Sequence, residues 1–300
     1  MSDLEADYRH LRDDVGAFDL PRDFVRVAGP DAAAYLQGQC SQELEPLAVG
    51  SAADTLVLAP DGKIEALARV VRVAEDAFHL DVDGGHGAAL LARLARFKLR
   101  SKLDLEPIDW SCLALRGPAA AGAAGSGAAL VVPVDWSGWS GVDLLGPTGS
   151  VGAPPGVTRC SEAAWEAARI ESGVPVMGRE LTEGVIPAEA GVVERAVSFT
   201  KGCFTGQELV ARIDSRGASV PHRLRGLVVE AEADPATLGG RALFVEGKDK
   251  TVGRVTSAAR CPGIGAVGAL AYVHRSVELP GPVRLGPAGP MAAVRELPLV

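Results

Sequence analysis

The chain has 300 residues, of which 47% are hydrophobic and 23% are charged, so it can bury a sizeable core in one large or two to three ordinary domains. Its net charge of −8 argues against sequence-independent nucleic-acid binding as the main task, because phosphate contacts need a basic surface. No basic segment followed by an apolar run opens the chain, and no apolar stretch reaches membrane-spanning length. We therefore expect a cytoplasmic protein that has neither nucleic acid nor a membrane as its main partner.

The cysteines are odd in number, lie far apart and show no CxxC spacing, and the five histidines are equally scattered. This pattern is typical of a reduced protein without a disulfide framework, and it predicts no zinc or iron–sulfur site. The five cysteines are Cys40, Cys112, Cys160, Cys203 and Cys261.

The first hundred residues alternate between strand-like and helix-like patterns. Asp31 is a candidate N-cap for a helix over 32–37 that Gly38 would end. A Pro-Asp-Gly turn between two apolar runs predicts a β-hairpin. A second helix is expected over 86–102, where Leu90, Leu94 and Phe97 share one face. The ranges interpreted as strands are 24–28, 55–58, 64–73 and 78–82.

The C-terminal half of that second helix is strongly basic and holds no acid. One interpretation is a solvated face that pairs favourably with the dipole at the helix C-terminus. The other is a basic rim that attracts an anionic ligand. The cations are Arg93, Arg96, Lys98, Arg100 and Lys102.

The middle of the chain predicts short strands around a Gly/Ala/Ser-rich loop over 117–129, and then a helix that Ser161 begins and Gly173 ends. From residue 224 onward, short Val/Leu-rich strands recur every eight to twelve residues, which is typical of a β-barrel or β-sandwich. A domain boundary is expected at 218–223. The expected strands before that boundary are 103–108, 112–115, 130–134, 142–145 and 195–200.

Residues 201–208 (KGCFTGQE) place a cation, a thiol and a helix start within eight residues. Thr205 and Glu208 match a capping box, which predicts a helix that begins near Gly206. A helix N-terminus and the nearby Lys201 should both lower the pKa of the Cys203 thiol. The alternative is that Cys203 is a small buried hydrophobe in an ordinary strand-to-helix turn.

This string resembles the KGC[YF]xGQE signature of the YgfZ family of folate-binding proteins, which is related to the T-protein (aminomethyltransferase) of the glycine cleavage system. Residues 27–40 (VAGPDAAAYLQGQC) and 169–191 resemble further blocks of that family. The resemblance covers about 17–275 and implies an α+β fold. Two interlocked α+β units (ferredoxin-like, T-protein-like) would surround a central channel, with a small C-terminal β-barrel. The implied domains are a discontinuous folate-binding domain over 1–50 and 106–217, an inserted domain over 51–105, and a barrel over 222–300.

The resemblance also implies a function. The protein would be a tetrahydrofolate-binding accessory factor in the assembly or repair of iron–sulfur clusters, with client or assembly proteins as partners. Cys203 and Lys201 would be its catalytic residues, and the basic rim would attract a folate glutamate tail. Glu171 is the candidate partner of the pterin ring, since a carboxylate can accept two hydrogen bonds from an aminopyrimidine edge. The further implied folate-binding residues are Glu65, Gly202, Gly206, Gln207 and Arg212.

One departure from the T-protein pattern concerns the hairpin. Aminomethyltransferases carry two acids after the turn, whereas this chain has Glu65 followed by Ala66. A missing carboxylate cannot act as an acid or base, so folate binding without ordinary glycine-cleavage chemistry is expected. Whether the protein is an enzyme stays open. The alternatives are a folate-dependent aminomethyltransferase or demethylase that uses Glu65 or Glu171 as its base, and a thiol enzyme in which His222 activates Cys203.

Overall fold

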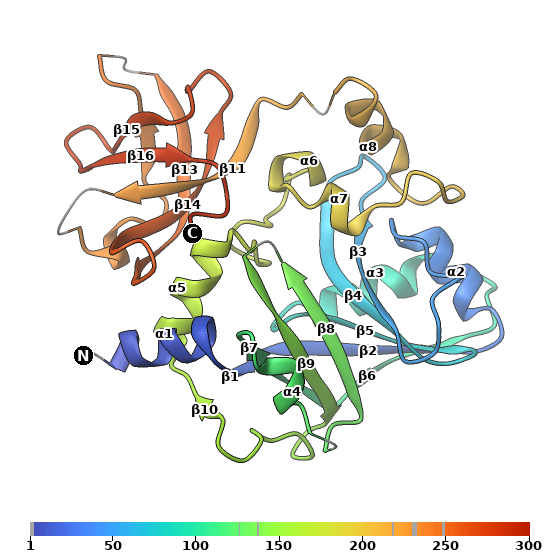
Figure 1. The fold of residues 1–300 in the computed structure, drawn as a ribbon. Helices are drawn as coiled ribbons and strands as arrows, with labels where there is room; N and C mark the ends of the chain where they lie inside the picture. The colour runs from blue at the N-terminus through green and yellow to red at the C-terminus, as the bar shows by residue number, and fades with distance from the viewer. Residues whose placement is uncertain (1–2, 126, 137, 218, 230–232, 248–249) are drawn as a thin grey trace.

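The computed structural model describes residues 3–125, 127–136, 138–217, 219–229, 233–247 and 250–300. Two open five-stranded sheets lie together, and a closed six-stranded barrel stands to one side of them (Figure 1). These elements confirm the expected α+β class and the C-terminal barrel. None of the described helices is long and apolar enough to cross a membrane.

The first sheet, sheet A, has the strand order β10-β1-β7-β9-β8. The short helix α4 (Ala120–Ala123) covers one face, where Leu113, Val142 and Leu144 form a core with Ala120. Helices α1 (Asp3–Asp13) and α5 (Glu162–Ser172) pack together at the other side of the sheet. The strands are β1 (Gly16–Leu20), β7 (Trp110–Arg116), β8 (Leu130–Trp136), β9 (Trp139–Pro147) and β10 (Thr158–Arg159).

The second sheet, sheet B, has the order β3-β4-β5-β2-β6 and is antiparallel throughout. Alternate residues of β4 point to opposite faces. Ala68 and Val70 of β4 pack with Leu90 and Leu94 of α3 (Gly87–Phe97), and α2 (Ala32–Gln39) joins the same core. The strands are β2 (Arg22–Ala28), β3 (Ala52–Leu58), β4 (Ile64–Ala74), β5 (Ala77–Asp83) and β6 (Asp104–Ile108).

The barrel closes in the order β11-β14-β13-β12-β15-β16, so its described strands leave no open edge. Valine, leucine and alanine side chains fill its interior. Its outer surface packs on α5, where Cys261 and Leu270 contact the same core as Ala167. The elements are β11 (His222–Val229), η1 (Pro235–Thr237), β12 (Ala242–Phe244), β13 (Thr251–Cys261), β14 (Ala266–His274), β15 (Gly281–Leu285) and β16 (Met291–Arg295).

Three short helices connect sheet A to the barrel: α6 (Pro187–Ala190), α7 (Val193–Ala196) and α8 (Gln207–Asp214). The predicted strand over 195–200 is wrong, because α7 occupies its beginning and 197–200 pair with no strand. The predicted boundary at 218–223 overlaps the start of β11 at His222, and residue 218 lies outside the described residues. Gly173 ends α5 with a φ of 71°, as the sequence predicts.

Strand pairing differs from the implied domain limits in one respect. Residues 22–28, which were expected in the first domain, form β2 and pair with β5 and β6 of sheet B. The reason is that Phe24, Val25 and Val27 are buried there, two of them in the core that α3 covers. The division into domains stays a prediction, but sheet B takes in strands from 22 to 108.

Two helix ends also differ from expectation. The expected helix over 86–102 ends at Phe97, and the basic residues after it form a turn that leads into β6. Asp31 does not cap α2 with its side chain. Its carboxylate instead accepts a 2.6 Å hydrogen bond from the backbone N–H of Lys102, so it fixes that turn.

Candidate functional site

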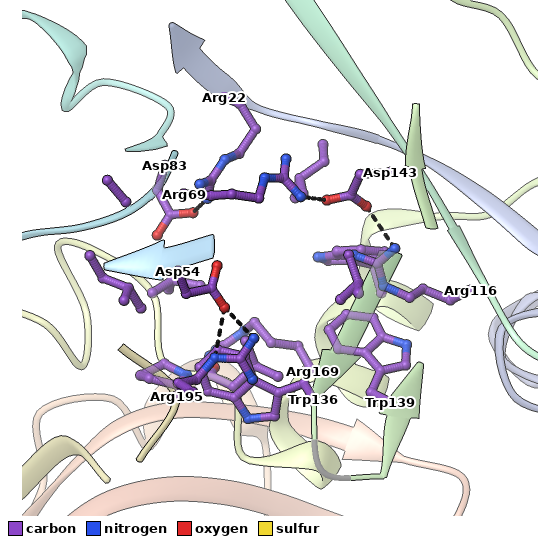
Figure 2. Close-up of a pocket in the computed structure, with 18 of the residues that line it drawn as sticks. Arg22, Asp54, Arg69, Asp83, Arg116, Trp136, Trp139, Asp143, Arg169 and Arg195 are labelled. Atoms are coloured by element: carbon purple, nitrogen blue, oxygen red, sulfur yellow. Dashed lines mark hydrogen bonds and ion pairs between the residues drawn. The ribbon is translucent and has the colours of Figure 1, made fainter. Parts of the chain in front are cut away.

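A cavity of about 140 Å³ lies between sheets A and B, bordered by α5 and α7 (Figure 2). Strands β2, β3, β4 and β5 supply one wall, and β7, β8 and β9 supply the other. Five arginines, three aspartates and three tryptophans line it, together with small apolar groups. The charged and aromatic residues are Arg22, Arg69, Arg116, Arg169, Arg195, Asp54, Asp83, Asp143, Trp136, Trp139 and Trp165.

Buried ion pairs build the wall between the two sheets. Asp143 of β9 accepts from Arg69 of β4 at 2.6 Å and from Arg116 of β7 at 2.7 Å. Arg69 also donates to Asp81 at 2.9 Å, and Asp81 pairs with Arg22 of β2 at 2.7 Å. The network therefore ties sheet A to sheet B through charged groups that water barely reaches.

The protonation of this network follows from its charges. Burial alone would raise the pKa of Asp143, but the guanidiniums of Arg116 and Arg69 outweigh that effect and hold the pKa at about 2. Burial would lower the pKa of Arg69, and the carboxylates of Asp81 and Asp143 raise it well above its usual range. Asp143 and Arg69 are consequently both ionised near neutral pH.

Asp54 and Arg195 are among the charged lining residues that a ligand can reach. Their side chains are each 25% exposed, whereas those of Asp143 and Arg69 are below 10%. Arg195 Nε donates to Asp54 Oδ2 at 2.8 Å, and the guanidinium carbon lies 3.8 Å from the ring centroid of Trp136. Figure 2 shows the pair with Trp136 at one side of the hollow, across from Arg22 and Asp83.

This arrangement suits a planar, polar ring. An indole face offers stacking, and a carboxylate and a guanidinium beside it can accept and donate at the ring edge. The volume is below the roughly 300–1,000 Å³ of sites that enclose a whole drug-sized ligand. The cavity would therefore take one ring of a ligand whose remainder lies outside.

None of the eight residues that the sequence proposed for catalysis or binding lines this cavity. Glu171 of α5 is fully buried on another side, where it accepts from Tyr8 Oη and from Ile264 N at 3.3 Å. It joins α1 and the barrel to α5. Burial raises the pKa of Glu171, and the hydrogen bond from Tyr8 partly offsets this effect.

A raised pKa in the folded state makes stability depend on pH with a definite sign. The stability that Glu171 contributes is fully present below the ordinary glutamate pKa of about 4.3. It is lost as the pH rises through the higher pKa that Glu171 has in the folded state. Glu171→Gln, which mimics the protonated acid, should flatten this dependence and leave neutral-pH stability equal or higher. Thermal midpoints of both proteins between about pH 5 and pH 8 test this, and parallel curves would contradict it.

Lys201 is also buried, and its ammonium group points at backbone. It donates to the carbonyl oxygens of Gln37 at 2.6 Å, Cys40 at 2.7 Å and Gln42 at 2.8 Å. These carbonyls belong to the C-terminal end of α2 and the turn after it, a position that favours a cation. Lys201 thus stabilises the turn after α2. Cys203, two residues later, is exposed, whereas the other four cysteines are buried.

Lys201→Met should cost about 3 kcal/mol of unfolding free energy, because three buried carbonyls lose a charged donor. Urea denaturation measures this loss. The matched control is Lys63→Met, since Lys63 is about half exposed and forms its ion pair with Asp61 at the surface. The control should stay within about 0.5 kcal/mol of the wild type. An equally small effect at Lys201 would show that the three hydrogen bonds contribute nothing.

The predicted capping box at Thr205 is wrong. Gly206 is the N-cap of α8, with a φ of 81°, and no side chain caps the helix. A Cβ at Gly206 would lie 2.6 Å from the carbonyl oxygen of Ala59, so glycine is required for close packing against the β3–β4 turn. Gly202 is exposed, Gln207 is half-buried at the start of α8, and Arg212 pairs with Glu208 on its surface.

Glu65 occupies a separate groove of about 560 Å³ between β4, α3 and residues 177–183. Arg93 of α3 binds its carboxylate and also donates to the carbonyl oxygen of Leu58 at 2.9 Å. His86 and Glu183 line the same groove. Glu65, Glu171 and Cys203 therefore lie in three different places, and Cys203 and His222 form no hydrogen bond among the described residues.

The cavity residues carry weak signals in the sequence. Trp136 and Trp139 flank the β8–β9 turn and stand out only because the chain has four tryptophans. Asp54 lies within a strand, and Arg195 lies in a segment that reads as a strand but forms α7. Only the docking of one sheet against the other brings these residues together.

Comparison with known proteins shows which sequences this chain resembles. Residues 1–126 match the family model described as the GCVT N-terminal domain. An aminomethyltransferase of Streptomyces avermitilis is 28% identical over 314 aligned residues, covering 92% of this chain and 82% of that protein. The human mitochondrial iron-sulfur cluster assembly factor IBA57 is 33% identical over 223 residues, covering 65% and 61%.

A solved structure shows the shared fold. The glycine cleavage system aminomethyltransferase T from Bartonella henselae superposes with a TM-score of 0.83 over 99% of this chain and 89% of that one. The two sequences are 22% identical. The similarity therefore concerns the architecture of sheets and barrel.

Proposed function

We propose that this protein, which is related to aminomethyltransferases through its GCVT domain, is a tetrahydrofolate-binding accessory factor in the assembly or repair of iron–sulfur clusters. The observation that carries the folate part is the cavity between the sheets, with the Asp54–Arg195 pair beside Trp136. The iron–sulfur part is supported by the similarity to human IBA57, whose name states that activity, and by the exposed thiol of Cys203.

The residues present fit a pterin ring. Asp54 can accept hydrogen bonds from an aminopyrimidine edge, and the ring can lie against Trp136. Arg195 holds the Asp54 carboxylate in position through their ion pair, while the buried Asp143 network fixes the opposite wall. Bound tetrahydrofolate would supply a carrier for one-carbon units. Asp54 therefore takes the role that the sequence suggested for Glu171.

Cys203 acts at the protein surface in this proposal. It lies outside the residues that line the cavity, on the exposed segment before α8. An exposed thiol can contact a cluster or a partner protein directly, which a buried one cannot. Lys201 supports it indirectly, because its three hydrogen bonds hold the start of this segment against α2.

Replacing the thiol should abolish the activity without unfolding the protein. In cells that lack this protein, Cys203→Ser should fail to restore the activity of an iron–sulfur enzyme, although the hydroxyl keeps the size of the side chain. Thr200→Ala, a change on the same exposed segment, should restore it fully. Full restoration by Cys203→Ser would contradict the role of the thiol.

A folate-dependent aminomethyltransferase or demethylase is the second candidate, favoured by the similarity to aminomethyltransferases over 92% of the chain. Glu65 and Glu171 lie outside the cavity, and Asp143 is buried between Arg69 and Arg116, so the base would have to be Asp54 or Asp83. Steady consumption of a methylamine donor with formation of methylene-tetrahydrofolate would favour this candidate. Folate binding without turnover would favour the accessory factor.

A further inference from the structure

The end of α3 and the turn that leads from it to β6 carry a concentrated positive charge on an otherwise acidic chain. Arg96, Lys98, Arg100 and Lys102 fall within seven residues, and no acid occurs between Gly87 and Leu103. The chain as a whole has a net charge of −8. We call residues 96–102 the basic turn.

The cations of the basic turn have no acidic partner within the described residues. The guanidinium carbon of Arg96 lies 5.6 Å from the centroid of the Phe97 ring. Arg93, one helical turn earlier, shows the contrast, because it is buried and bound to Glu65. The charge of the basic turn is therefore available to a molecule outside the chain.

Leu99 stands at the tip of this turn and is 87% exposed. Its φ is 48°, and among the described residues it is the one non-glycine residue with a positive φ. The left-handed region is unfavourable for a bulky side chain and natural for glycine. A leucine here displays an apolar side chain in solvent at the expense of backbone strain, a combination that points to a contact outside the chain.

The basic turn is remote from the cavity between the sheets. Strand β2 begins at Arg22, which lines the cavity, and ends at Ala28, which pairs with Asp104 just after the turn. Seven strand residues span about 20 Å. The turn therefore does not line the cavity itself, and the interpretation of its basic residues as a rim for the tail of a ligand stays a prediction. The turn can bind a partner while the cavity is occupied.

We propose that the basic turn is a docking site for an acidic partner protein that receives Leu99 in an apolar pocket ringed by carboxylates. An apolar anchor inside a polar rim is the usual anatomy of a protein interface, and the surrounding cations would steer the encounter. Nucleic acid would have to unstack its bases to receive a leucine, and it would repel the acidic remainder of the chain. A lipid surface would gain little from one leucine side chain.

The test begins with the whole protein in cells. A photo-crosslinking amino acid at position 99 should capture a protein that the same group at Val49, a 60% exposed position elsewhere, does not capture. The captured protein is then purified and titrated against variants. Leu99→Gly and the double change Lys98→Glu with Arg100→Glu should each weaken binding by at least about tenfold, and added salt should weaken wild-type binding.

Two controls separate docking from folding. Leu99→Gly should leave the thermal midpoint unchanged or raised, because glycine accepts the left-handed backbone. Lys250→Glu, a charge reversal at another exposed lysine, should leave binding unchanged. The proposal is overturned if position 99 captures nothing beyond the Val49 control, or if both turn variants bind as the wild type does. It is equally overturned if the same variants instead abolish binding to duplex DNA, to phosphatidylserine vesicles or between copies of this chain.

Discussion

Asp143→Ala is expected to destabilise the protein by about 3–5 kcal/mol, the cost of breaking a buried ion network by removing one partner. The change leaves the guanidiniums of Arg69 and Arg116 buried with part of their compensation gone. Urea denaturation followed by circular dichroism measures the loss. A loss of this size is a large fraction of the unfolding free energy of a typical domain. The variant should therefore be partly unfolded at moderate temperature.

Asp19→Ala is the matched control, because Asp19 forms an ion pair with Arg159 that is largely exposed. Its loss should cost at most about 1 kcal/mol. Equal effects at the two aspartates would contradict the structural role of the network. Because the folded-state pKa of Asp143 is depressed, its contribution is present above the ordinary aspartate pKa of about 3.9 and is lost as pH falls through about 2.

Leu67→Trp is expected to weaken tetrahydrofolate binding by about 100-fold, equivalent to roughly 2.7 kcal/mol. Leu67 lines the cavity from β4 and is only half-buried, so an indole there would extend into the hollow. Isothermal titration with tetrahydrofolate measures the affinity. The thermal midpoint without folate should change little, since the added bulk occupies open space.

Val49→Trp controls for the added indole, because Val49 is exposed and is not one of the residues that line the cavity. It should bind tetrahydrofolate as the wild type does. Cys203→Ala should also bind normally, which separates the thiol from the folate pocket. Binding by Leu67→Trp at wild-type affinity would place the folate site somewhere other than this cavity.

Much of the fold follows from local pattern. The Pro-Asp-Gly turn between two apolar runs gave the β3–β4 hairpin, and Ser161 and Gly173 bounded α5. The barrel strands are short, rich in valine and leucine, and separated by turn residues, so their regular spacing is visible in the sequence. The failures fall where tertiary contacts decide. Thr205 cannot act as a cap because the chain turns at Gly206 to pack against Ala59.

The candidate site was far less predictable. The motif at 201–208 made Lys201 a candidate catalytic residue, but its ammonium group donates hydrogen bonds to three backbone carbonyl oxygens. Glu171 also matched a motif, and its carboxylate holds α1 and the barrel instead. The cavity depends on Asp54, Trp136 and Arg195, which are far apart in the chain and have no local pattern. A motif marks residues that matter, but only packing shows whether they face a ligand or the core.

The central claim is that the cavity between the sheets binds tetrahydrofolate, and a tryptophan fluorescence titration tests it most directly. Three of the four tryptophans line the cavity, and the fourth, Trp110, does not. The account predicts saturable quenching by tetrahydrofolate with one site per chain, preserved in Trp110→Phe. Absence of saturable quenching, or its loss in Trp110→Phe, would contradict it.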